Sequence, residues 1–574
     1  MPASLARFRS LATARLYLCA PSALFYLLLA VFWGCLWRLP LLNGDDRLFA
    51  NASNLPHGRQ TWTGITTMVD KTWNTFNGRL ADGLGAAWFG FGLGGARVLM
   101  ALGYVLFAFL VWVYATRLGP KDEGDYAQLS PWRTWVRRDL LAQLLASAIP
   151  FMLIGFHFHL SGDAVFSMAV VWNYLFSLNL VLLAFYPLAR AARGGFSWRW
   201  QLAAAPLIVL AMVMHEMTSV AALGLVAGLL AFCPRLLARP VTWVSLAATG
   251  YGFYLKVTAP GLWERIERNS KPTGSPNDLL PEEVKLHLRL AGTLANVAVV
   301  YIALVVLVAA TLIWLHGRAL LTTTTPSWPR WQPSQRLWVG SLAALYAVSA
   351  TCVGAWIMAG RRYLLIIDDA YGRGRYPLIT QMDDASGAVI GWALASFVML
   401  ALLALTLPRQ LVGPLPLALF GAIAVSLAAN SYMARSLYAG VGRDHYIALL
   451  LMGTLIITNL VALSRFGGAG RAVSVLSGGV LFVAGSTLVL CANQLLVNYG
   501  AWQQVEAQFA AAASGQSTLV EIPKTMPCNN VISYQWIDPP TSNVKHLRIF
   551  YGLGSKVQIK TVPQELTCGP ATNR

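Results

Sequence analysis

Two adjacent carboxylates, Asp45 and Asp46, directly follow the first apolar segment of the chain, in the stretch LPLLNGDDRLFANA (39–52). A carboxylate held near a membrane surface can act as a general base for a hydroxyl, or as a ligand for a metal ion or a sugar hydroxyl. The plainer interpretation is an ordinary solvated loop acid, and it fits the later acidic pairs at 368–369 and 383–384 better. The first pair stands out because the end of a hydrophobic segment fixes its position.

Basic residues gather with aromatic ones in two later segments. The stretch NSYMARSLYAGVGRDHY (430–446) holds Arg435, Arg443 and His445, and GRRYLLIIDDAYGRGRYP (360–377) holds Arg375. Arginine offers a planar, permanently charged fork that matches a phosphate group. Cations at headgroup depth suit a phosphate carried on a long lipid. The alternative is that each arginine extends its charge to ordinary lipid phosphates.

The sequence HEMTS (215–219) separates two short apolar segments and places His215 and Glu216 at the break. Ionisable groups at membrane depth are costly and usually face a cavity. A zinc site of the H-E-x-x-H type needs a second histidine where this chain has Ser219, so that interpretation is excluded. Two interpretations stay open, namely a hydrogen-bonded pair that caps a helix end and a pair that belongs to a substrate site.

Two further charged residues lie next to predicted membrane segments. Arg79 lies in TFNGRLADG before the second apolar segment, and Asp163 lies in HLSGDAV, where its plainer role is a cap for the following helix. The chain has no Walker A sequence, no G-x-S-x-G and no nucleotide-binding fingerprint. Direct use of a nucleotide or nucleotide sugar is therefore not indicated.

Composition identifies the fold class as an all-α polytopic membrane protein. Of 574 residues, 56% are hydrophobic and 12% are charged, and the mean hydropathy is +0.56, whereas soluble domains carry about 25% charged residues. Apolar runs of the length that crosses a bilayer recur along the chain. We predict about thirteen transmembrane helices, at 17–37, 90–116, 140–160, 164–189, 201–214, 217–233, 241–258, 290–315, 337–359, 387–407, 411–429, 446–464 and 473–496.

The net charge of +19 follows from topology and does not require nucleic acid as a partner. With the N-terminus in the cytoplasm, the predicted inner segments contain 19 basic and 4 acidic residues. This asymmetry is the positive-inside pattern of a multi-pass protein. The lipid bilayer is therefore the partner that the charge distribution indicates.

The large loop at 38–89 is predicted to lie outside and to contain an amphipathic helix. Its apolar residues are spaced by three and four positions, which places them on one helical face: Trp62, Ile65, Val69, Trp73, Phe76 and Leu80. Such a helix lies in the bilayer interface or packs on neighbouring loops, and the spacing alone does not decide between these.

An odd number of spans also places the C-terminus outside. We predict a transmembrane domain at 1–496 and a small extracytoplasmic β or α/β domain at 497–574, whose strand-like pieces are STLVEIP, HLRIFYG and KVQIKTV. The last two cysteines of the chain, Cys528 and Cys568, lie in this domain, where an oxidising environment would allow a disulfide.

The order of these motifs resembles the GT-C superfamily of polytopic glycosyltransferases, in particular the bacterial enzymes that modify O-antigen and other surface glycans. The resemblance rests on NGDD after the first span, TFNGRLADG before the second, and ARSLYAGVGRDHYIALLL entering a late span. It implies a GT-C-like fold in the bacterial cytoplasmic membrane. It also implies inverting transfer of a sugar from a polyprenyl-phosphate donor to a glycan or cell-envelope acceptor on the outer face.

The resemblance also implies roles for individual residues. Asp45 or Asp46 matches the position of the base. Arg435 and Arg443, together with His445 two positions further on, match positions that contact the donor phosphate. Arg79, Asp163, His215, Glu216 and Arg375 are expected to line the substrate cavity. The resemblance establishes no cofactor with certainty. The family's commoner acidic pattern separates the two acids by one residue, so the adjacent acids here leave a requirement for Mg²⁺ or Mn²⁺ open.

Two other classes remain open on the sequence. A flippase or transporter of lipid-linked glycans would favour internal repeats and ionisable residues within its spans, and the spans show no repeat. An O-antigen polymerase or ligase also has large outer loops with arginines. It fits less well with NGDD directly after the first span and with an external C-terminal domain.

We expect Cys528 and Cys568 to form a disulfide, because two cysteines in one oxidising domain usually pair. Alkylation of free thiols before reduction, followed by gel electrophoresis, measures this in protein purified from membranes. Alkylation of both thiols without reductant would contradict the predicted outer location of the tail or the pairing itself.

Overall fold

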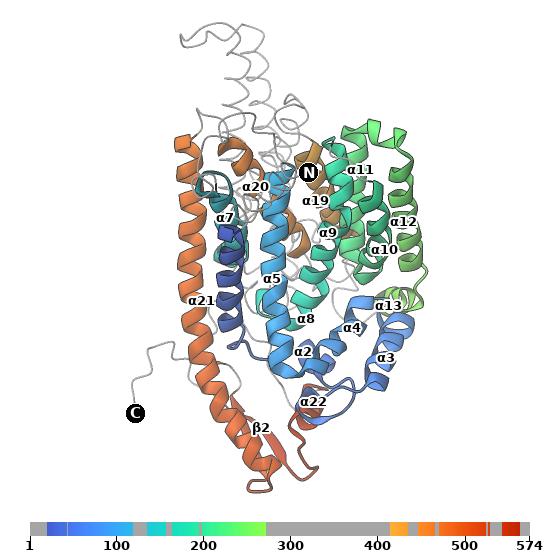
Figure 1. Ribbon diagram of the computed structural model, residues 1–574. Helices are drawn as coiled ribbons and strands as arrows, with labels where there is room; N and C mark the ends of the chain where they lie inside the picture. Colours follow the sequence, from blue (N-terminus) through green and yellow to red (C-terminus); the bar gives the residue numbers. More distant parts are fainter. Residues whose placement is uncertain are drawn as a thin grey trace, which may run out of the picture.

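The computed structural model is a bundle of long helices with smaller elements gathered at one end (Figure 1). The described residues are 20–42, 44–118, 135–156, 164–194, 198–270, 414–433, 446–464, 470–523, 526–527 and 542–562. Helices dominate them because a helix satisfies its backbone hydrogen bonds within one segment, which a lipid environment demands.

Helices occupy ten of the thirteen predicted spans within the described residues. The spans predicted at 290–315, 337–359 and 387–407 lie outside the described residues. The ten comprise a first helix (Ala20–Leu36), α5 (Gly92–Arg117), α7 (Leu141–Phe156), α8 (Met168–Val170) continuing through η6 (Val171–Phe176) into α9 (Ser177–Ala192), α10 (Trp198–Met214), α11 (Glu216–Phe232), α12 (Pro240–Val257), α19 (Pro414–Met433), α20 (Tyr446–Ser464) and α21 (Gly470–Ala513).

Within the part of the chain that the structure describes, three helical stretches are long and apolar enough to cross a membrane by length and composition: Leu80–Arg117, Met168–Ala192 and Val473–Ala513. This is compatible with an all-α membrane protein. The total of thirteen crossings and the orientation of the ends stay predictions.

Short elements connect these helices. Seven belong to the first large loop or follow α12, namely α2 (Gly44–Ala50), η1 (Pro56–Gly58), α3 (Trp62–Lys71), η2 (Thr72–Phe76), α4 (Leu80–Trp88), η3 (Phe89–Phe91) and α13 (Pro260–Ser270), and two more are η4 (Val136–Leu140) and η7 (Pro234–Ala238). Figure 1 shows α2, α3, α4 and α13 together at the lower end of the bundle. This is the end that the charge pattern predicts to face outward.

The amphipathic segment of the first loop forms two helices. Five of the six apolar positions lie on α3 and η2, and the helix stops before Asn77, so that Leu80 begins α4. Gly78 makes the turn with a φ of +64°, and a Cβ there would lie 2.7 Å from the Leu262 backbone nitrogen. Trp62 is 77% exposed, whereas Met68 is buried. The predicted helix is therefore confirmed, but it ends one turn earlier than the apolar pattern.

The C-terminal segment is continuous with the last long helix, since α21 runs without a break through the predicted boundary at 496/497. Beyond it, β1 (Leu519–Pro523) pairs in parallel with β2 (Gln558–Val562), in the register Leu519 to Gln558. The helix α22 (Ser542–Tyr551) lies between them in the chain. Two of the three predicted strands are confirmed.

The prediction of a strand at HLRIFYG was wrong, because these residues form most of α22. Its aromatic and β-branched residues favour a strand locally. Buried Leu547 and Phe550 lie three positions apart, on one helical face that contacts α2 and η1. Tertiary packing therefore decides the conformation of this segment.

Two glycines of α11 let this helix approach α19 closely. A Cβ on Gly228 would lie 2.6 Å from the Ala418 Cα, and one on Gly224 would lie 2.7 Å from the Gly421 carbonyl oxygen. Small residues at such contacts stabilise helix association in membranes through close van der Waals packing.

Replacing Gly228 by valine should separate α11 from α19 and lower the free energy of unfolding by about 1–3 kcal/mol, the usual cost of overpacking. Unfolding of the purified protein in mixed detergent micelles measures this. Gly250→Val is the matched control, since among the described residues no atom lies within 4 Å of a Cβ built there. An equal loss of stability in both variants would contradict close α11–α19 packing.

Candidate functional site

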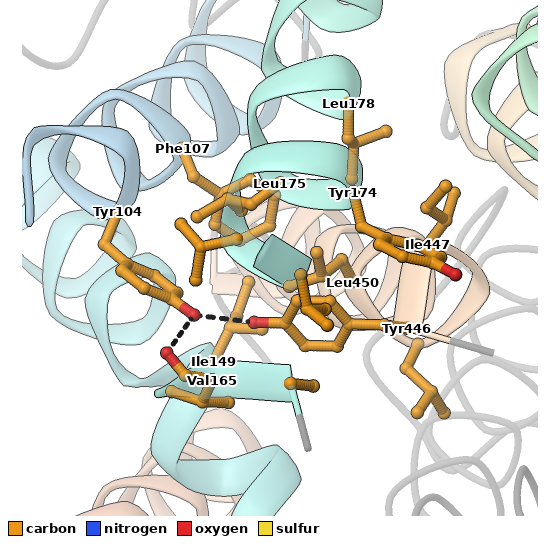
Figure 2. Packing of buried hydrophobic residues seen from close by; sticks show 14 of the residues in the cluster. Tyr104, Phe107, Ile149, Val165, Tyr174, Leu175, Leu178, Tyr446, Ile447 and Leu450 are labelled. Atoms are coloured by element: carbon orange, nitrogen blue, oxygen red, sulfur yellow. Dashed lines mark hydrogen bonds between the residues drawn. The ribbon is translucent and has the colours of Figure 1, made fainter. Parts of the chain in front are cut away.

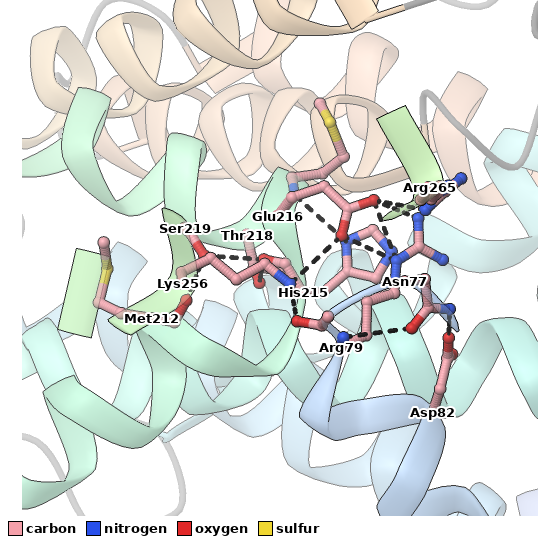
Figure 3. Close-up of polar contacts among 12 residues, drawn as sticks. Asn77, Arg79, Asp82, Met212, His215, Glu216, Thr218, Ser219, Lys256 and Arg265 are labelled. Atoms are coloured by element: carbon pink, nitrogen blue, oxygen red, sulfur yellow. Dashed lines mark hydrogen bonds and ion pairs between the residues drawn. The ribbon is translucent and has the colours of Figure 1, made fainter. Parts of the chain in front are cut away.

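A cluster of charged side chains lies at the lower end of the bundle, where the first loop meets the break between α10 and α11 (Figures 1 and 3). We call it the Glu216 cluster. It consists of Glu216 at the start of α11, Arg79 just before α4, Lys256 near the end of α12, and Arg265 on α13. Four separate segments of the chain are therefore joined at one carboxylate.

Each cation of the cluster contacts the Glu216 carboxylate. Arg79 donates from Nε to both oxygens, at 3.0 and 2.8 Å, and from Nη2 to Oε1. Arg265 donates from Nη1 to Oε1 at 3.0 Å, and Lys256 Nζ lies 3.6 Å from Oε2. The side chains of Glu216 and Arg79 are 12% and 11% exposed, whereas that of Arg265 is 36% exposed. Arg265 therefore forms the surface edge of the cluster.

The turn Asn77-Gly78-Arg79 positions the cluster from the first loop. The Gly78 carbonyl oxygen accepts a hydrogen bond of 2.5 Å from Lys256 Nζ. Asn77 accepts from the Arg79 backbone nitrogen at 3.2 Å and donates to the buried carboxylate of Asp82. The sequence analysis names Arg79 from this turn as an expected cavity residue, and the structure shows that the turn orients both Arg79 and Lys256.

His215 caps α11 and forms one wall of the cluster. Its Nδ1 accepts a hydrogen bond of 3.2 Å from the Met217 backbone nitrogen. Its ring is fully buried, and its centroid lies 4.4 Å from that of Tyr174. Within the described residues Nε2 has no hydrogen-bond partner. His215 therefore caps the helix, as one of the two interpretations expected. Glu216 has a different role, since its carboxylate pairs with cations from three other segments.

Positive charge exceeds negative charge in this site. Three cations face Glu216, and the second carboxylate, that of Asp82, is buried on the other side of Asn77. Burial alone would lower the pKa of Arg79, but Glu216 raises it above its ordinary value. Arg79 and burial lower the pKa of Arg265. An anion beside Arg265 would offset this repulsion, because an opposite charge stabilises the charged form of a group.

The acidic pair lies on α2, which is at the same end of the bundle. The carboxylate of Asp46 is fully buried, and its Oδ1 accepts a hydrogen bond of 2.6 Å from the Ala169 backbone nitrogen at the start of α8. This bond satisfies an amide that has no partner within its own helix. For Asp45 the structure describes the helical backbone only.

The other predicted site residues lie outside the described residues: Asp163, Arg375, Arg435, Arg443 and His445, together with Cys528 and Cys568.

The hydroxyl of Tyr104 on α5 contacts both Val165 and Tyr446. Tyr104 donates to the Val165 carbonyl oxygen at 2.8 Å and lies 3.0 Å from the Tyr446 hydroxyl (Figure 2). The start of α20 is therefore fixed to α5 and to the chain before α8.

Sequence reasoning missed Lys256 and Arg265. A lysine inside an apolar run is a signal that can be used, because an ionisable group at membrane depth needs a partner. Arg265 carries no comparable signal, since α13 is polar and resembles an ordinary loop helix. Among the described residues, no group of three His, Cys, Asp or Glu side chains is placed to hold a metal ion.

Comparisons of the chain with known proteins found no similar sequence or structure. No family model matches the chain, and searches of curated proteins and of solved structures found no match.

Replacing Glu216 by glutamine should destabilise the protein by about 3–5 kcal/mol, because it leaves buried cations without their counter-charge. Unfolding in mixed detergent micelles measures the loss. Glu264→Gln on α13 is the control, since this side chain is exposed and should unfold like the wild type. A Glu216→Gln protein as stable as the control would show that the cations do not depend on this carboxylate.

Proposed function

We propose that the protein is a GT-C-type glycosyltransferase of the bacterial cytoplasmic membrane, with its N-terminus in the cytoplasm and its C-terminus outside. It would move a sugar from a polyprenyl-phosphate donor to a glycan or cell-envelope acceptor. The observation that supports this most directly is the Glu216 cluster. It gathers an excess of cations at the same end of the bundle as Asp45 and Asp46.

The reaction needs a group that stabilises negative charge on the leaving phosphate. The acceptor hydroxyl oxygen attacks the anomeric carbon, the bond from that carbon to the phosphate oxygen breaks, and the phosphate keeps the electron pair. Fixed cations directed at this developing charge lower the barrier. Arg265 is the member of the cluster placed to meet the phosphate, because it lies at the surface edge. A lipid tail held in the bilayer would position the donor beside it.

A carboxylate then takes the proton of the attacking hydroxyl. We assign this role to Asp45, because Asp46 is buried and one of its oxygens already binds the start of α8. Asp46 would be a positioning residue that fixes α2 against α8. In the same proposal Arg435, Arg443 and His445 bind the donor phosphate. Attack from the face opposite the leaving phosphate inverts the anomeric carbon.

One observation favours a second candidate, a flippase for lipid-linked glycans. Lys256 is 2% exposed and lies within α12, and Glu216 begins α11. Ionisable groups inside membrane helices are a mark of transport pathways. The two candidates differ in what they do to the same lipid, since one cleaves the sugar–phosphate bond and the other moves the intact molecule across the bilayer.

We expect Asp45→Asn to lower sugar transfer by about 100-fold or more, the contribution typical of a general base. The assay uses proteoliposomes with a panel of radiolabelled polyprenyl-phosphate sugars and purified envelope glycan as acceptor. Asp70→Asn is the control, because Asp70 is an exposed acid on α3 in the same loop. Full transfer by Asp45→Asn would remove the base assignment. Transbilayer movement of the lipid without any transfer by the wild type would establish the flippase.

A further inference from the structure

A second cationic site lies where the C-terminal segment meets the first loop, and it shares no residue with the Glu216 cluster. It is a cavity of about 40 Å³ enclosed by α2, the start of α5, α21 and α22. A single buried water needs roughly 10–15 Å³, so the cavity has room for a larger polar group. We call it the Arg47 pocket.

Arg47 is the buried cation of this pocket. It is 4% exposed, and its guanidinium lies 5.8 Å from the centre of the Trp502 ring. Within the described residues Nη1 has no hydrogen-bond partner, and no carboxylate oxygen lies within 4 Å of the guanidinium. Burial lowers the pKa of Arg47 to about 10, and the charges of Tyr551 and Asp46 offset this effect only in part. A buried guanidinium whose charge is only partly compensated is unfavourable, so the geometry favours an anion in the cavity.

A second arginine gives the pocket a positive balance. Arg97 lines it from the first turns of α5 and donates from Nη2 to the Pro40 carbonyl oxygen at 2.9 Å. The acid in the lining, Glu506, accepts a hydrogen bond of 3.4 Å from the Tyr551 hydroxyl. The residues that line the pocket therefore include two arginines and one acid.

The position of the pocket along α21 indicates what it meets. Tyr499 and Trp502 line it at the point where the apolar part of α21 is predicted to leave the bilayer. Tyrosine and tryptophan concentrate at the level of the lipid headgroups. The pocket is thus expected at the depth where phosphate groups of lipids are present at high local concentration.

We propose that the Arg47 pocket binds a phosphate group, supplied by the headgroup of an anionic phospholipid. One phosphate oxygen would accept the hydrogen bond from Arg47 Nη1, and the negative charge would compensate the buried guanidinium of Arg47. Because the lining residues come from α2, α5, α21 and α22, an occupied pocket would link the C-terminal segment to the first loop.

The test is the thermal stability of delipidated full-length protein in a neutral detergent. Phosphatidylglycerol should raise the unfolding midpoint by about 3 °C or more, as expected for a ligand well above its dissociation constant. Phosphatidylcholine should raise it much less. Arg47→Gln should abolish the difference between the two lipids. Arg59→Gln, at an exposed position of the same loop, should preserve it.

A parallel arm with inorganic phosphate distinguishes the source of the anion. An Arg47-dependent shift with phosphatidylglycerol alone supports a lipid site, and a comparable shift with inorganic phosphate supports a site for free phosphate. Arg47→Lys keeps the charge but loses the planar fork, so it should retain a reduced lipid shift if Arg47→Gln fails to fold. Equal shifts with both lipids in the wild type, or a shift that persists in Arg47→Gln, would overturn the proposal.

Discussion

The contact between the Glu216 carboxylate and three cations is the constraint on which this end of the molecule depends. Removing four charged groups from water carries a large desolvation cost, and their mutual attraction offsets it only when the geometry is good. The paired bonds from Arg79 and the bond from Arg265 meet that condition. The cluster therefore fixes the relative positions of α4, α11, α12 and α13 more than it adds net stability.

A second set of contacts connects the first loop to the C-terminal segment. Asn51 donates a hydrogen bond of 2.7 Å to the His546 carbonyl oxygen, 495 positions later, and Phe550 lies against Gly58. The helix α2 has seven residues and is too short to be stable alone. It is held because consecutive residues point to different neighbours, Asp46 to the start of α8 and Arg47 to α21. The acidic motif thus depends on the C-terminal segment for its position.

Hydropathy predicted the helices well and the site only in part. The spans predicted at 217–233 and 241–258 differ by only one residue at each end from α11 and α12. They agree because apolar runs and the backbone hydrogen bonds within a helix depend on the local sequence. Arg79 and Glu216 were each named from local sequence, but their pairing across 137 positions was not. Arg265 and the helix at HLRIFYG were missed because their roles come from contacts that no local pattern encodes.

The predicted positive-inside pattern would account for most of the net charge, yet it does not explain the cations at the opposite end. Arg47, Arg79 and Lys256 are buried there, where membrane insertion gives no advantage to positive charge. Each carries a desolvation cost, so each needs a local counter-charge. Glu216 supplies it for Arg79 and Lys256, whereas for Arg47 the charges of Tyr551 and Asp46 offset the effect of burial only in part. In the proposed lipid site, an anionic headgroup would supply the missing charge.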